Sequence, residues 1–172
     1  SLTDFSGGGY FVLAANDHIV FPARGGILRV IEAAAGLGES TSIDVSATLQ
    51  PDEQVTSVMP DWQGRYWYVG SLGTVGVVRD GRAEAINLDG EDIENSFALA
   101  EEGAYVATGA ALYRLEAGPT GPPEVAWRTA YDAGTRQKPG QTSRATGTTP
   151  TLFEGGVAIT DNADPQMNVV VF

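Results

Sequence analysis

The chain contains no cysteine, one histidine (His18) and one lysine (Lys138) in 172 residues. Without cysteine there is no disulfide framework, no thiolate catalysis and no cysteine-ligated zinc site. A single histidine excludes histidine-rich metal sites, and we expect His18 in a hairpin turn on the face opposite the candidate site. Any acid–base chemistry would therefore fall to carboxylates, tyrosines or a metal-bound water.

Positive charge and long apolar runs are also scarce. The chain has ten lysine and arginine residues and 22 acidic residues, so its net charge is -12 at pH 7. This charge excludes nucleic acid as a partner, because phosphate binding needs basic patches, and it argues against anionic membrane surfaces. No run of 18 apolar residues exists, and the sequence therefore predicts no membrane insertion. Neither the charge nor the lack of cysteine identifies a compartment.

Apolar and polar residues alternate with a period of two along most of the chain, whereas amphipathic helical periodicity is nearly absent. The pattern of strand, polar turn, strand, gap and strand recurs four times. Gly, Asn and Asp accept the positive φ of hairpin turns. The expected turns are Asn16-Asp17, Asp61–Gly64, Glu101–Gly103 and Glu154–Gly156.

A further strand follows each of the first three repeats, in "TSIDVSAT", "AEAINLD" and "EVAWRTA". Four antiparallel strands in a repeat of about forty to fifty residues are typical of a β-propeller blade. The sequence thus predicts an all-β fold, a β-propeller with about four four-stranded antiparallel blades and an incomplete ring. The expected blades cover approximately residues 8–48, 55–88, 94–129 and 147–172, the last without its outer strand.

The closing residues 169–172 are apolar and are typical of an interior strand that awaits a neighbour. We expect the ring to be completed by remaining blades of the same polypeptide, of which this chain would be a cleaved or truncated piece. A second copy of the chain that closes the ring is the alternative. A complete small sandwich or barrel is the third interpretation.

The second repeat carries the stretch "PDWQGRYWYVG", followed by "GVVRDGR". It is similar to the D-x-x-G-x-(L/Y)-W-(V/Y) signature of bacterial propellers of the NHL, SMP-30/gluconolactonase and quinoprotein-like superfamilies. In this signature Asp61 and Gly64 make the turn and Trp67 packs between blades. The whole chain also resembles a family of actinobacterial β-propeller proteins to which no activity is attached.

The resemblance has limits that bear on cofactors. The tryptophan-docking motif of PQQ alcohol dehydrogenases (A-x-D-x-x-T-G-x-x-x-W) is missing, so a PQQ cofactor is not supported. The metal quartet of the SMP-30 lactonases has no residue-by-residue match. Trp62, Trp67 and Trp127 are interpreted as packing between blades rather than as ligand-stacking residues.

Small polar residues begin the expected innermost strands, in "VTSV" (55–58), "ENSF" (94–97) and "GTTP" (147–150). Loops that lead into innermost strands share a propeller face with the loops that join second and third strands. These polar side chains would therefore ring the channel mouth, where they could bind a ligand or trapped water. The predicted ligand-binding residues are Glu94, Asn95, Ser96, Thr148 and Thr149.

The stretch "TDNADPQMN" belongs to the same face and supplies oxygen ligands of the kind that hard cations select. Asp161, Asn162 and Asp164 are therefore candidate ligands of a Ca²⁺ ion, alone or together with Glu94 and Asn95. The spacing lacks the glycine and the distal glutamate of an EF-hand loop. A turn stabilised by Asx-type hydrogen bonds is the alternative interpretation.

The connection over residues 131–147 is long for a propeller and contains Arg136, Lys138 and Arg144, three of the ten basic residues. Beside the channel, this basic segment could attract a carboxylate or a phosphate group. The alternative is an exposed, protease-sensitive loop with solvated charges.

Three functions follow from these features. The first is a non-catalytic propeller that presents a polar channel-mouth site to a small anionic ligand or a protein partner. The second is a calcium-dependent hydrolase or lactonase-like enzyme, in which Arg136 or Arg144 orients an anionic substrate. The third is a purely structural fragment of a longer propeller.

Overall fold

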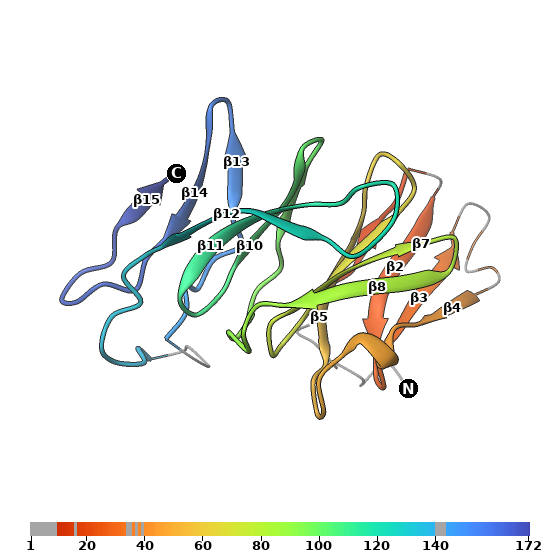
Figure 1. Ribbon diagram of the computed structural model, residues 1–172, viewed down its shortest axis with the longest axis horizontal. Coiled ribbons are helices and arrows are strands. Elements are labelled where there is room, and N and C mark those ends of the chain that lie inside the picture. The colour runs from red at the N-terminus through yellow and green to blue at the C-terminus, as the bar shows by residue number, and fades with distance from the viewer. Residues whose placement is uncertain (1–9, 16, 34–35, 37, 39, 140–143) are drawn as a thin grey trace.

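The computed structural model describes residues 10–172 except 16, 34–35, 37, 39 and 140–143. Within this part of the chain the strands form four antiparallel sheets, each built from one continuous stretch of sequence (Figure 1). The first sheet contains β1 (Val12–Leu13), β2 (His18–Ala23), β3 (Ile27–Glu32) and β4 (Ser40–Asp44), and the short 3-10 helix η1 (Ser46–Thr48) follows it.

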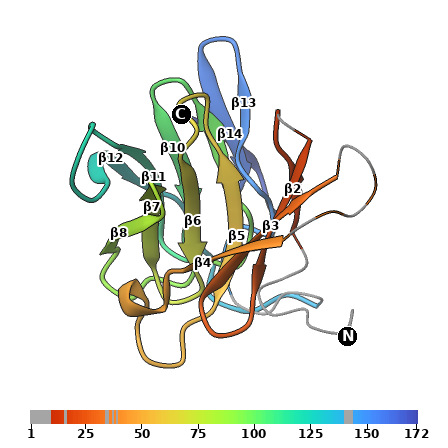
Figure 2. The ribbon, with the colours of Figure 1, turned by 90° about the vertical axis from the view of Figure 1, so that its right-hand side faces the viewer.

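The other three sheets repeat this up-and-down order, as Figure 2 shows for β5 to β8. The second contains β5 (Val55–Pro60), β6 (Tyr66–Gly70), β7 (Thr74–Arg79) and β8 (Arg82–Asn87). The third contains β9 (Ala98–Ala100), β10 (Gly103–Ala107), β11 (Ala111–Glu116) and β12 (Glu124–Ala130). The fourth has three strands, β13 (Thr151–Phe153), β14 (Gly156–Thr160) and β15 (Val169–Val171).

The sheets follow one another as the blades of a β-propeller do, and the first and fourth sheets lie at opposite ends of the molecule (Figure 1). The described residues therefore form an arc and do not close a ring. The predicted all-β, propeller-like architecture with an incomplete ring is confirmed. A small sandwich or barrel is excluded as a description of this arc, because each sheet packs on its sequence neighbours.

Three apolar clusters fill the three spaces between consecutive sheets. Leu28 and Tyr68 belong to the cluster between the first and second sheets, and Trp67 and Leu115 belong to the cluster between the second and third. Leu112 and Ile159 belong to the cluster between the third and fourth. Each fully buried side chain of this size contributes roughly 1.5–3 kcal/mol. These contacts between blades, rather than a single central core, hold the arc together.

The turn predicted at Asp61–Gly64 and the packing predicted for Trp67 are confirmed. Asp61 Oδ1 accepts hydrogen bonds from the backbone N–H groups of Gln63 (2.9 Å) and Arg65 (3.0 Å), and Gly64 has φ +77°. Trp67 is 1% exposed and its Nε1 donates to Asp61 Oδ2 at 3.0 Å. One carboxylate therefore closes the turn and anchors the tryptophan that packs between the sheets.

Three local predictions were wrong. Trp62 does not pack between blades, because its place in the β5–β6 turn leaves it 68% exposed. The strand expected in "TSIDVSAT" ends at Asp44, whose carboxylate accepts the Ser46 N–H and so begins the 3-10 turn. The strands β9 and β13 begin only at Ala98 and Thr151, because the preceding residues cross from one sheet to the next.

Candidate functional site

The loops of the protein gather on two faces, which we name by their connections. The loop face carries the described segments that lead into the innermost strands (49–54, 88–97, 131–139 and 144–150) and those that join the second and third strands of each sheet. The hairpin face carries the turns between the first and second strands. Every predicted site residue belongs to the loop face, because antiparallel strands alternate in direction.

Ser96 and Thr148 bond to neighbouring strands rather than to open space. Ser96 is buried, and its hydroxyl lies 2.7 Å from that of Ser57 on β5, which joins the second and third sheets. Thr148 Oγ1 accepts the Thr160 N–H at 3.1 Å and lies 3.0 Å from Thr146 Oγ1. Both hydroxyls therefore hold loops onto strands. Thr149 is half-buried beside them.

Glu94 and Asn95 are half-buried in the loop before β9. The Oε1 atom of Glu94 is buried and has no hydrogen-bond partner in the structure. Burial, together with the negative charges of Glu91 and Glu94, raises the pKa of Tyr131 to about 12. The Tyr131 hydroxyl donates to the carbonyl of Thr108 and accepts the Thr146 N–H at 2.9 Å, so it links the third and fourth sheets.

The basic segment and the acidic segment predicted as separate sites contact each other. Asp164 Oδ2 accepts the Thr135 N–H at 2.9 Å and the Thr135 hydroxyl at 2.8 Å. Asp164 Oδ1 accepts from Arg136 Nε at 3.1 Å. The two Thr135 bonds and the Arg136 guanidinium lower the pKa of Asp164 to about 2. We call this contact between residues 131–139 and 161–168 the loop clasp.

Asn162 and Lys138 form the buried half of the loop clasp. The side-chain amide of Asn162 donates to the carbonyls of Ala133 (2.9 Å) and Arg136 (3.2 Å), and the residue is fully buried. Lys138 Nζ donates to the carbonyls of Asn162 (3.1 Å) and Ala163 (2.8 Å). The lysine therefore supplies hydrogen-bond donors to two backbone carbonyls of the 161–168 loop.

Asp161 stabilises the 161–168 loop from within. Its carboxylate accepts three N–H groups, from Ala163 (3.2 Å) and from the backbone (2.7 Å) and side chain (2.8 Å) of Asn168. Burial opposes ionisation of Asp161, but the Asn168 and Ala163 bonds and the Lys138 charge outweigh it and lower the pKa of Asp161. This is the Asx-type turn that was the alternative to a calcium loop.

The loop clasp accounts for most of the charged residues predicted to bind ligands. Arg136 is paired with Asp164, Lys138 with carbonyls, and Asp161 with N–H groups. Arg144 is exposed in the segment that leads to β13. Within the described residues, no three His, Cys, Asp or Glu side chains are arranged to hold a metal ion. The calcium and anion sites stay predictions.

Removing the Asp164 carboxylate is expected to open the loop clasp. In Asp164→Asn the charge-assisted bonds to Thr135 and Arg136 weaken, and trypsin should cleave after Arg136 several-fold faster at pH 8. Mass spectrometry of the early fragments measures this rate. Gln166→Ala, in the same loop and exposed, is the matched control and should digest as the parent does. Equal rates for both variants would contradict the clasp.

The pKa of Asp164 also gives the clasp a direction of pH dependence. The folded pKa, about 2, lies below the value of about 3.9 for an unfolded aspartate. Asp164 therefore stabilises the loop clasp in full when the pH is above the pKa of the unfolded aspartate. This stabilisation is lost as the pH falls through the pKa of Asp164 in the folded protein. Hydrogen exchange at the Thr135 amide should report this loss.

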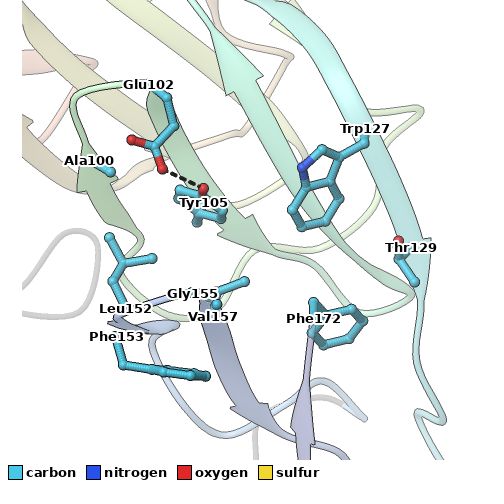
Figure 3. Close-up of a pocket in the computed structure, with 11 residues that line it drawn as sticks. Ala100, Glu102, Tyr105, Trp127, Thr129, Leu152, Phe153, Gly155, Val157 and Phe172 are labelled. Atoms are coloured by element: carbon cyan, nitrogen blue, oxygen red, sulfur yellow. Dashed lines mark hydrogen bonds between the residues drawn. The ribbon is translucent and has the colours of Figure 1, made fainter.

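The hairpin face contains a pocket of about 670 Å³ between the third and fourth sheets. Tyr105, Trp127, Phe153 and Phe172 contribute aromatic rings to its wall, and Glu102 contributes a carboxylate (Figure 3). Tyr105 Oη donates to Glu102 Oε1 at 2.8 Å.

Sequence reasoning missed this pocket because it treated the hairpin face only as the site of turns. Trp127 packs on the apolar cluster between the third and fourth sheets, as predicted, and it also lines the pocket. The sequence does contain the two aromatic residues, Tyr105 on β10 and Trp127 on β12. Both lie opposite Arg114 of β11, and this is known only once the strand register is known.

No protein-family model and no curated protein sequence matches this chain. The resemblance to bacterial propeller families therefore stays a prediction. Within the residues that the structure describes, no helix has the length and apolar character needed to cross a membrane.

Proposed function

We propose that this chain acts by binding rather than by catalysis, as a β-propeller interaction module whose two end faces dock against further blades. The supporting observation is a contrast in exposure. Side chains that face a neighbouring sheet inside the arc are buried. The apolar side chains that point outward from the first and last sheets are exposed or only half-buried.

The first end face belongs to the first sheet. Successive residues of a strand point to opposite faces of the sheet. On the innermost segment, Val12 and Ala14 pack toward the second sheet. Phe11 and Leu13 point the other way and are 70% and 65% exposed.

The second end face belongs to the fourth sheet and repeats this alternation. Val170 and Phe172 pack toward the third sheet. Val169 and Val171 point away from it and are 72% and 61% exposed. Large exposed apolar side chains that gather on a sheet face mark interaction surfaces. Further blades, whether of the same polypeptide or of a second copy, present the apolar sheet face that would cover them.

The other two expected functions have less support. Binding of a small anion at the loop face would use Arg136 and Lys138, which the loop clasp already engages. A calcium-dependent hydrolase would use Asp161, whose carboxylate accepts three N–H groups. The polar side chains of the loop face instead fasten one blade to the next, which is the role of a scaffold.

Charging the second end face is expected to abolish self-association of the chain. The parent chain, 18.0 kDa, should show a mass that rises with concentration in light scattering, because its end faces cover one another. Val169→Lys/Val171→Lys should stay monomeric, since the new charges must remain in water. Gln63→Lys/Thr120→Lys adds the same charge at exposed positions elsewhere and should associate as the parent does. A parent chain that is monomeric at every concentration would refute the docking role.

A further inference from the structure

The pocket on the hairpin face combines aromatic rings with one carboxylate. Tyr105 comes from β10, Trp127 from β12, Phe153 from the end of β13, and Phe172 follows β15. The rings of Tyr105 and Trp127 lie 6.0 Å apart at 66°, in an edge arrangement. Figure 3 shows Tyr105 and Trp127 on one side of the space and Phe153 and Phe172 on the opposite side. Rings on several sides of one space are suited to an apolar or cationic group.

The carboxylate of Glu102 is ionised at neutral pH. The hydrogen bond from the Tyr105 hydroxyl is the main reason that the pKa of Glu102 is lowered. Burial and the neighbouring Glu102 carboxylate raise the pKa of Tyr105, so the phenol keeps its proton and remains the donor. The pair presents a fixed negative charge at the edge of an aromatic space.

The neighbouring cation, Arg114, interacts electrostatically with Glu102 and helps to lower the pKa of that carboxyl group. Arg114 lies between Tyr105 and Trp127 in the strand register. Its guanidinium forms an ion pair with Glu116, which leaves Glu102 as the carboxylate that faces the pocket. Glu154, between the lining residues Phe153 and Gly155, adds a second negative charge nearby. The whole chain carries a net charge of -12, so its field also attracts cations.

We infer that this pocket binds a small organic cation with an apolar body, of the class of aryl or alkyl ammonium ions. The faces of Tyr105, Trp127 and Phe172 contact the alkylated nitrogen and its apolar substituent. The Glu102 carboxylate balances the charge at the rim. The volume of about 670 Å³ lies within the range of roughly 300–1,000 Å³ typical of small-molecule sites. This site is separate from the end faces, so the inference goes beyond the proposed docking role and does not depend on it.

The test uses benzyltrimethylammonium, whose positive charge cannot be titrated, as the probe. Binding is followed on the indole N–H signal of Trp127 by NMR, with the signals of Trp62 and Trp67 as internal references. A saturable shift confined to Trp127, with a dissociation constant of about 1 mM or lower, is expected. The uncharged hydrocarbon of the same shape should bind at least about fivefold more weakly.

Two matched substitutions separate charge from shape. Glu102→Gln keeps the size of the side chain and should lower the affinity for the probe by about fivefold, as expected for an exposed charge pair. Glu101→Gln, one residue earlier and outside the pocket, should leave the affinity unchanged. Added salt should weaken binding of the probe to the parent protein and should have little effect on its binding to Glu102→Gln.

Three results would overturn the inference. They are no saturable shift of Trp127 up to about 10 mM probe, equal affinity for the uncharged hydrocarbon, or equal losses in Glu102→Gln and Glu101→Gln. The second outcome would assign the pocket to a neutral apolar ligand, and the third would assign the effect of charge to the general field of the acidic chain. None of the three bears on self-association, so failure here and failure of the docking role are distinguishable.

Discussion

Trp67→Ala is expected to lower the free energy of unfolding by about 4 kcal/mol. Trp67 is 1% exposed and lies in the apolar cluster between the second and third sheets. Its removal leaves a cavity that the β-strands on either side cannot collapse to fill. It also leaves Asp61 Oδ2 without the indole N–H, which donates to it at 3.0 Å. Urea unfolding followed by circular dichroism measures the change.

Trp62→Ala is the matched control for this experiment. Trp62 is only five residues away and is 68% exposed in the β5–β6 turn. Its removal should change the free energy of unfolding by less than about 0.5 kcal/mol. Similar losses for the two variants would mean that Trp67 does not pack between sheets, and the stacked-blade architecture would then be wrong.

Glu53→Ala is expected to cost about 3 kcal/mol, because it leaves buried donors without an acceptor. Glu53 is 7% exposed, and its carboxylate accepts from the backbone N–H groups of Leu72 (2.8 Å) and Thr74 (3.0 Å). It also accepts from the Thr74 hydroxyl (2.6 Å) and the Gln50 N–H (2.8 Å). The carboxylate thus ties the loop before β5 to the β6–β7 turn. Gln54→Ala, next in sequence and exposed, should be nearly neutral.

A double substitution tests the same contact by geometry. A Cβ at Gly70 would lie 2.3 Å from Glu53 Oε1, so Gly70→Ala alone should also be strongly destabilising. In the Glu53→Ala background the space is free. The two losses should therefore sum to clearly more than the loss of the double variant. Strict additivity, as for distant residues, would show that the glutamate does not occupy this position.

The sequence was most informative where the signal is local. The carboxylate and glycine of Asp61–Gly64 specify their turn within four residues. The repeat of this pattern was sufficient to predict consecutive antiparallel sheets. It did not place the start of β9 or β13, because the residues before them cross from one sheet to the next and pairing within the sheet begins only at Ala98 and Thr151.

The candidate sites depended on contacts between distant residues. From the sequence, Asp164 was assigned to a Ca²⁺ ion and Arg136 to an anionic ligand, because the segment around each residue carries charge without a local partner of opposite sign. Folding brings the two loops together, and the opposite charges bond to each other. Sequence spacing alone does not show whether a charged side chain meets a ligand or another loop.

The sequence by itself determined that this protein is built of antiparallel blades, since a period of two and turn residues act over a few neighbouring positions. Only the tertiary structure decided what the polar and aromatic residues do. In the folded protein Asp164 bonds to the basic loop, and Asp161 accepts hydrogen bonds within its own turn. Glu102 lies beside Tyr105 and Trp127 at a pocket. The physical reason is that packing of one sheet on the next sets these distances, and no local pattern records them.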